Sequence, residues 1–247
     1  KPQELIELKH IRADLHLHTT YSDGAHSIKE MAEMARKRGY EYIAITDHSQ
    51  FLKVANGLDE DRLKRQMEEI RKLNETYDDF TIFTGIEMDI LPDATLDFPD
   101  RLLEEIDFVI ASIHSAFSQD EETIMKRLEA ALRNPHVDLI AHPTGRLLGK
   151  RDGYAADVER LIELAKETKT ALELNANPYR LDLAPKWLKK AEEAGVIIAI
   201  NTDSHTYETY SYMEYGISMA KRGHLRKQSV INTWPVEKFR QFLQRHQ

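Results

Sequence analysis

The sequence predicts an α/β fold in which parallel strands close into a barrel. Short apolar runs rich in β-branched residues alternate about seven times with segments whose apolar residues recur at helical spacing. This alternation is typical of a parallel sheet covered by helices. Seven strands in 247 residues close most economically as a barrel, and we expect one domain over residues 1–247.

Local signals place the helices between these runs. Ser27 and Glu30 form a capping-box pattern that opens the first helix, and Gly39 ends it. Asp59 can cap the second helix. Further helices are expected near residues 119–133, 156–168, 185–194 and 212–222. The last segment, residues 230–247, is expected to close the barrel, or else to pack on a partner domain.

Histidines and carboxylates follow almost every predicted strand. His16 and His18 stand one residue apart in an alternating run, so both project from one face of a strand, and Asp23 follows just before Gly24. The same residue types end the later apolar runs: His48, Glu87, His114, His142, Asp203 and His205. Because the C-terminal ends of barrel strands meet at one end, these residues predict a single metal site.

The ligand set indicates more than one ion. Six histidines and three carboxylates exceed the roughly three protein ligands of a mononuclear catalytic site, so we expect two or three ions. Mixed imidazole and carboxylate ligands suit Mn²⁺, Zn²⁺ or iron better than Mg²⁺ or Ca²⁺. Such a cluster predicts phosphoester hydrolysis by a metal-activated hydroxide. No Ser-His-Asp, Cys-His or P-loop pattern offers a competing mechanism.

The composition of the chain bears on nucleic-acid binding, membrane association and cellular compartment. The net charge of −8 argues against avid nucleic-acid binding, although bound cations would reverse the charge locally. There is no cysteine, no signal peptide and no apolar run of membrane-spanning length, so we expect a cytoplasmic protein without a membrane partner. The first residue is Lys1 rather than methionine, which favours a domain cut from a longer chain.

Six motifs together resemble the signature of the PHP (polymerase and histidinol phosphatase) domain. They are D-L-H-L-H-T-T-Y-S-D-G (14–24), I-T-D-H (45–48), G-I-E (85–87), S-I-H-S (112–115), A-H-P (141–143) and N-T-D-S-H (201–205). The resemblance covers about residues 11–217. The contexts H-P-T-G-R-L-L (142–148), N-A-N-P-Y-R-L-D-L (175–183) and N-T-W-P-V-E-K-F (232–239) look most like the C-terminal PHP domain of bacterial family X DNA polymerases.

The resemblance implies a distorted (βα)7 barrel with three ions at the strand ends. One ion would be held by His16, His18, Glu87 and Asp203, a second by Glu87, His114 and His142, and a third by Asp23, His48 and His205. Glu87 would then bridge two ions about 3.5–4 Å apart. The resemblance favours manganese for activity, with zinc in the purified protein.

The resemblance also implies a function and partners. The leading hypothesis is a 3′→5′ exonuclease or 3′-end processing activity in DNA repair, with DNA 3′ ends and the N-terminal polymerase modules of a parent chain as partners. One alternative is a small-molecule phosphomonoesterase resembling histidinol-phosphate phosphatase. Another is a non-catalytic accessory domain whose metals only stabilise the fold.

Four loop residues are candidates for substrate contact. Arg146 follows His142 in a glycine-containing loop and is expected to act on a phosphate, with Glu87, in catalysis; Arg180 is a second candidate phosphate clamp. Tyr21 and Tyr179 could stack on a base or sugar. The alternative for each is an ordinary surface-loop residue.

Overall fold

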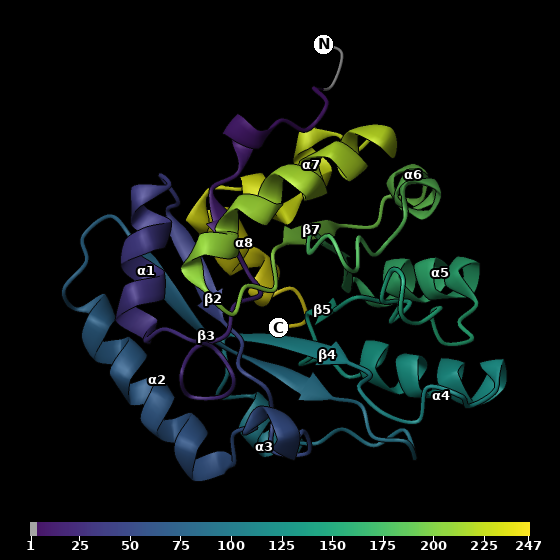
Figure 1. Cartoon of the computed structure of the whole chain (residues 1–247), viewed down its shortest axis with the longest axis horizontal. Helices are drawn as coiled ribbons and strands as arrows, with labels where there is room; N and C mark the ends of the chain where they lie inside the picture. The colour runs from purple at the N-terminus through teal and green to yellow at the C-terminus, as the bar shows by residue number, and fades with distance from the viewer. Residues whose placement is uncertain (1–3) are drawn as a thin grey trace.

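The computed structural model describes residues 4–247. Seven parallel strands form one sheet in the sequential order β1 to β7 (Figure 1). The strands are β1 (Ala13–Asp14), β2 (Tyr42–Ile45), β3 (Thr81–Asp89), β4 (Phe108–Ser112), β5 (Leu139–Ile140), β6 (Ala171–Asn175) and β7 (Ile198–Asn201). Every consecutive pair is parallel, as in the register that sets Ala13 beside Tyr42 and Leu172 beside Ile198. The predicted sheet is therefore confirmed.

The first and last strands nearly close the barrel. Beyond β1, Leu17 pairs in parallel with Ser204 beyond β7, and the Leu15 N–H donates to Asn201 Oδ1 at 3.1 Å. The fully buried Asn232 lies between the two strands. Its Nδ2 donates to the carbonyls of Ala13 at 3.0 Å and Ile200 at 2.7 Å, and its Oδ1 accepts from the Ile200 N–H at 2.8 Å. One side chain thus replaces the missing ladder bonds.

The helices surround the sheet, with α1 and α2 on one side and α4 and α5 on the other (Figure 1). They are α1 (Ile28–Lys37), α2 (Glu60–Asn74), α3 (Asp100–Leu103), α4 (Glu121–Leu132), α5 (Val158–Thr168), α6 (Pro185–Ala194), α7 (Met213–Arg222) and α8 (Val236–Leu243). Ser27 and Glu30 form the expected capping box, and Asp59 Oδ1 accepts from the Arg62 N–H. Within residues 4–247, none of these helices is long and apolar enough to cross a membrane.

An aromatic plug fills the N-terminal end of the barrel. Phe239 of α8 is fully buried, and its ring lies 5.1 Å from Tyr42, 4.9 Å from Phe83 and 5.7 Å from Phe108, centre to centre. Tyr42 also donates from its hydroxyl to the Trp234 carbonyl at 2.8 Å. The last segment therefore closes the barrel, as expected. With this end filled, any site accessible to a substrate must lie at the other end.

We expect Asn232→Ala to lower the free energy of unfolding by about 2–5 kcal/mol, because it leaves several buried backbone groups without partners. Denaturant titration followed by circular dichroism measures the change. Gln244→Ala, an exposed amide after α8, is the matched control and should leave stability within about 0.5 kcal/mol. A loss no larger than that of the control would contradict the closing role of Asn232.

Candidate metal centre

All nine residues expected to bind metal lie at the C-terminal ends of strands or in the loops that follow. They are His16 and His18 beyond β1, Asp23 before α1, His48 beyond β2, Glu87 in β3, His114 beyond β4, His142 beyond β5, and Asp203 and His205 beyond β7. Two of them have unusual backbone conformations, since φ is 29° at His142 and 56° at Asp203. Residues other than glycine adopt this region at a cost, and such outliers concentrate at functional sites.

Glu87 is the centre of the cluster. Its carboxylate is 1% exposed and faces imidazoles from five directions. The distances are 2.9 Å to His16 Nε2, 3.3 Å to His18 Nε2, 3.5 Å to His48 Nδ1, 3.2 Å to His114 Nε2 and 3.1 Å to His142 Nε2. A carboxylate in this position can bridge two cations, which is the role expected for Glu87.

Within residues 4–247, potential ligand atoms come together in three groups, and the atoms of each group lie within 4.8 Å of one another. The groups are His16, His18, Glu87 and Asp203; His48, Glu87 and His114; and His18, Asp23, His48 and His205. The first is the expected set. The second contains His48 where His142 was expected, although His142 Nε2 also reaches Glu87. The third adds His18 to the expected three residues, so His18 and His48 each belong to two groups.

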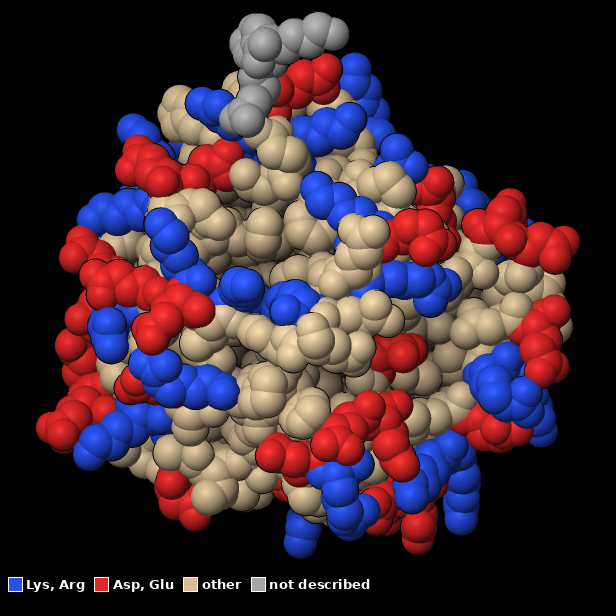
Figure 2. Space-filling model, turned by 180° about the vertical axis from the view of Figure 1, so that it is seen from behind, with Lys and Arg blue, Asp and Glu red and all other residues tan. Residues whose placement is uncertain are grey.

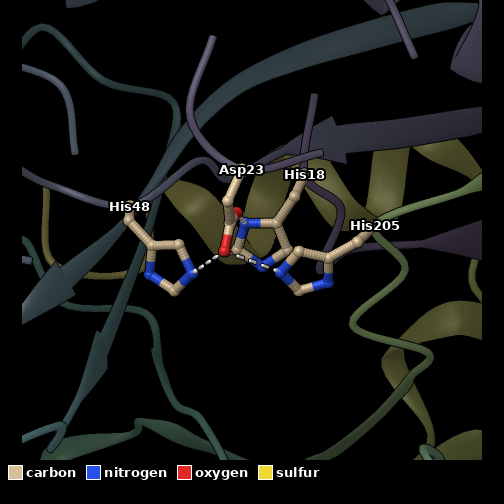
Figure 3. Close-up of side chains that lie close together, drawn as sticks. All are labelled: His18, Asp23, His48 and His205. Atoms are coloured by element: carbon tan, nitrogen blue, oxygen red, sulfur yellow. Dashed lines mark ion pairs between the residues drawn. The ribbon is translucent and has the colours of Figure 1, made fainter. Parts of the chain in front are cut away.

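Figure 3 shows the four side chains of the third group gathered around Asp23. Asp23 Oδ2 lies 3.3 Å from His205 Nε2 and 3.6 Å from His48 Nε2. The side chains of Asp23 and His205 are 33% and 39% exposed, whereas that of His18 is fully buried. The centre is therefore deep at Glu87 and open at Asp23.

The residues fit divalent cations. Nδ1 of His18, His48 and His142 is buried without a hydrogen-bond partner, which leaves three imidazole nitrogens unsatisfied in the interior. Burial lowers the pKa of His48 to about 3, and burial together with the positive charge of Arg180 lowers the pKa of His142 to about 4. Both rings are thus neutral at neutral pH, and neutral imidazole is the form that binds a metal.

Other imidazoles carry protons when the site has no metal. Burial opposes the charge of His18, but hydrogen bonds to Asp203 and Glu87 outweigh it and raise its pKa to about 10. Burial likewise opposes the charge of His114, where the negative charge of Glu87 prevails and raises the pKa to about 9. These protons balance the buried carboxylates, and cations entering the site would replace them.

Two carboxylates that the sequence reasoning missed orient the ligands. The His16 Nδ1–H donates to Glu173 Oε2 at 2.7 Å, and the His114 Nδ1–H donates to Asp89 Oδ1 at 2.5 Å. Glu173 is fully buried in β6 and also accepts from the His142 backbone N–H at 3.0 Å. Each contact leaves Nε2 of the histidine directed at Glu87. The sequence signal that could have identified both residues is a carboxylate at an inward-facing position of a predicted strand.

The two candidate phosphate clamps differ in their surroundings. The Arg146 guanidinium donates to the backbone carbonyls of Arg180 and Leu181, so it ties two loops together. Arg180 itself has a buried Nη1 without a hydrogen-bond partner, and its charge acts on His142. Of the two, Arg180 is the one with a buried guanidinium nitrogen left without a hydrogen-bond partner.

The two candidate stacking residues also differ. Tyr21 is partly buried against the core, and burial, followed by the negative charge of Glu69 of α2, raises the pKa of its hydroxyl. Tyr179 is 61% exposed in the β6–α6 loop, where its carbonyl accepts from the Leu148 N–H at 2.6 Å. Tyr179 therefore keeps a ring face open to solvent.

Comparison with known proteins agrees with this architecture. The model of the PHP domain family matches residues 14–177. The chain is 57% identical over 243 residues to the DNA polymerase/3'-5' exonuclease PolX of Bacillus subtilis, covering 98% of this chain and 43% of that protein. It is 30% identical to a probable phosphatase of Caldanaerobacter subterraneus, covering 94% of this chain and 90% of the relative. The chain thus spans less than half of PolX but nearly all of the phosphatase.

A solved structure shares the fold. The histidinol phosphate phosphatase of Lactococcus lactis, complexed with zinc, L-histidinol and phosphate, superposes with a TM-score of 0.64 at 20% identity. The match covers 87% of this chain and 94% of that one. At this identity the likeness concerns the arrangement of strands and helices.

We expect Glu173→Gln to weaken Mn²⁺ binding about 10- to 100-fold, because an amide cannot accept from both His16 and the His142 backbone as the carboxylate does. Isothermal titration calorimetry measures the dissociation constant. Glu129→Gln, a change on the surface of α4, is the control and should leave binding unchanged. Equal affinities in the two variants would show that Glu173 does not orient a ligand.

Metal affinity should rise with pH. The raised pKa values of His18 and His114 mean that both rings are protonated near pH 7 without metal, so a cation must displace these protons. Each rise in pH toward these pKa values weakens the competition from protons, so Mn²⁺ should bind progressively more tightly. Calorimetry at about pH 6, 7, 8 and 9, in buffers of different ionisation enthalpy, gives both affinity and proton release. Affinity that is constant with pH would refute the protonated state.

Proposed function

The chain belongs to the PHP domain family, and we propose that it is a metal-dependent phosphoesterase that shortens DNA from the 3′ end. Members of this family are metal-dependent phosphoesterases. The observation that carries the DNA assignment is the 57% identity with a protein named as a 3'-5' exonuclease, which extends over nearly the whole of this chain. We further propose that residues 1–247 form one domain of a longer polymerase chain.

The proposed ligands are the nine residues at the strand ends. Mn²⁺ or Zn²⁺ in two or three positions, with iron as a further possibility, would supply Lewis acidity and lower the pKa of bound water near phosphorus. Zinc is supported by its presence in the histidinol phosphate phosphatase structure. In this proposal Glu87 joins two positions, while Glu173 and Asp89 hold His16 and His114 in the tautomer that directs Nε2 inward.

Arg180 is proposed to bind the phosphate being hydrolysed. Its unpartnered Nη1 and its effect on His142 place a fixed positive charge beside the ligands. Arg146 helps to fix the backbone of Arg180, because its guanidinium donates a hydrogen bond to the Arg180 carbonyl at 2.9 Å. We therefore propose that Arg180 contacts the phosphate directly, and that Arg146, the first phosphate clamp expected from the sequence, also holds the Arg180 loop in place.

Positive charge in the loops at the open end of the barrel favours binding of a DNA backbone, despite the net charge of −8 of the whole chain. Three basic residues and one acidic residue line a hollow of about 470 Å³ in the β5–α5 loop, next to Arg180: Arg146, Lys150, Arg151 and Asp152. On the face in Figure 2, acidic and basic side chains intermingle around the outline and uncharged residues fill most of the middle. The positive charge needed for DNA is therefore proposed to be local to the β5 and β6 loops.

A small-molecule phosphatase is the second candidate. It is favoured by the probable phosphatase that this chain matches over 90% of the relative's length, and by the fold shared with histidinol phosphate phosphatase. The two functions need the same metals but different access, because a DNA strand requires an open groove beside the site. The exposed edge at Asp23 and His205 supports the larger substrate.

A two-substrate assay tests the proposal. The Mn²⁺-loaded chain should convert a 5′-labelled oligonucleotide into a ladder of products shortened from the 3′ end, and should release little phosphate from histidinol phosphate. Phosphate release without a ladder would replace the exonuclease by the phosphatase. If the metal-loaded chain forms neither product, the non-catalytic domain is the remaining hypothesis.

Arg180→Ala should lower kcat/KM on the oligonucleotide about 10- to 100-fold without lowering metal content, because a charge-assisted hydrogen bond is lost. Arg180→Lys should recover only part, since lysine lacks the planar fork. Arg160→Ala on the exposed face of α5 is the control. Wild-type kinetics in Arg180→Ala would return Arg180 to an ordinary loop residue.

A further inference from the structure

The loop between β2 and α2 presents apolar side chains to solvent beside the metal centre. Val54 is 95% exposed and Phe51 is 41% exposed, with the exposed Lys53 between them. We call these three residues the β2–α2 tip. Lys53 and Val54 belong to a single 3₁₀ turn, η2 (Lys53–Ala55). Val54 buries almost nothing, so its apolar surface contributes little to folding.

Hydrogen bonds in the first half of the β2–α2 loop hold the backbone of the tip in place. The carboxylate of Asp97 accepts hydrogen bonds from Ser49 Oγ at 2.6 Å and from the Phe51 backbone N–H at 2.8 Å. Ser49 also pairs in parallel with Leu58, which is fully buried, so the two ends of the loop lie side by side. The exposure of Phe51 therefore belongs to an anchored backbone.

The second half of the β2–α2 loop is equally constrained. Arg62 of α2 donates to the carbonyls of Asn56 at 3.0 Å and Gly57 at 3.2 Å. A Cβ built on Gly57 would lie 1.8 Å from the Ser49 carbonyl oxygen, so the chain closes on itself at a distance that only glycine permits. An anchored loop loses little conformational entropy when a ligand binds to it.

The tip borders the open edge of the metal centre. Phe51 follows His48 by three residues, so their Cα atoms can be no more than about 11 Å apart. The guanidinium that holds the loop also donates to the Tyr21 carbonyl, two residues before Asp23. The loop that carries the tip is thus joined to both the His48 and the Asp23 sides of the exposed ligand group.

We propose that Phe51 and Val54 form a stacking subsite for the nucleobase next to the hydrolysed phosphodiester, with Lys53 facing the adjoining phosphate. This inference rests on the proposed exonuclease function and assigns a substrate contact to that site. One aromatic ring and one aliphatic side chain match the face of a single base, and stacking on aromatics accepts any base. The tip is far smaller than the roughly 800 Å² per partner of a stable protein interface.

The subsite complements the opposite rim. Tyr179 and Arg180 follow β6, whereas the tip follows β2, so the two lie at separate points around the mouth of the barrel. On this arrangement Arg180 takes the phosphate and the tip takes a base. A substrate without a base would then lose the contact at the tip and keep the contact at Arg180.

The test compares oligonucleotides that differ only in one base. A 5′-labelled strand is prepared intact, and also with a tetrahydrofuran abasic residue at the last or the penultimate position. The wild-type chain with Mn²⁺ should shorten the intact strand about 5- to 100-fold more efficiently, in kcat/KM, than one of the abasic strands. The Phe51→Ala/Val54→Ala double variant should lose this preference by falling to the abasic level, while its rate on that abasic strand is unchanged.

Two further variants sharpen the comparison. Phe51→Trp should keep the preference, because it retains a ring. Leu8→Ala is the matched control, since Leu8 is an exposed apolar residue before β1, at the plugged end of the barrel. A 2-aminopurine placed at the preferred position should lose fluorescence when bound to the wild-type chain and not when bound to the double variant.

The outcomes separate this inference from the proposed function. If the wild-type chain makes a ladder and the double variant keeps the full preference for a base, the stacking subsite is wrong and the exonuclease stands. If kcat/KM of the double variant falls equally on the intact and the abasic strands, the tip only supports the position of His48, and the stacking subsite is again wrong. If the wild-type chain makes no ladder and does not quench 2-aminopurine, both proposals fall.

Discussion

The structure depends on keeping the carboxylate of Glu87 charged in the interior. Burial raises the pKa of a carboxyl group, yet the pKa of Glu87 is well below its usual value because imidazoles surround it. Those imidazoles come from the ends of four other strands, beginning with His16 beyond β1 and ending with His142 beyond β5. The nearly closed parallel barrel brings these strand ends to one point. The fold and the charge balance of the site therefore depend on one another.

The same constraint accounts for the less common features around the centre. Glu173 and Asp89 add negative charge to an acidic interior, and each is directed at the back of a ligand imidazole. The positive φ values at His142 and Asp203 are strained backbone conformations of the kind that concentrate at functional sites. At the other end of the barrel, the ring of Phe239 fills the interior with purely apolar contacts. One end thus supplies stability, and the other carries polar groups that are costly to bury.

Much of this could be predicted from the sequence, because the informative signals are local. The capping box at Ser27 and the placement of ligand residues after apolar runs depend on near neighbours in the chain. The short helix α3 was not foreseen, since four residues carry too little periodicity. The contacts of Arg146 and the sharing of His48 between two groups were not foreseen either, because they depend on how separate loops meet. The assignment of metal ligands remains a prediction that the geometry supports.

A chain with a net charge of −8 can still act on DNA if its affinity is supplied from elsewhere. The chain matches 43% of the length of the Bacillus subtilis polymerase. If it is one domain of a longer polymerase chain, as we propose, the other domains would hold the same DNA. Tethering raises the effective concentration of the 3′ end to the millimolar range, at which weak contacts suffice. Under that condition, tight phosphate binding over a broad surface would slow release of the strand after each cleavage. A small basic rim around Arg180, on an otherwise acidic domain, is the charge distribution that such an arrangement favours.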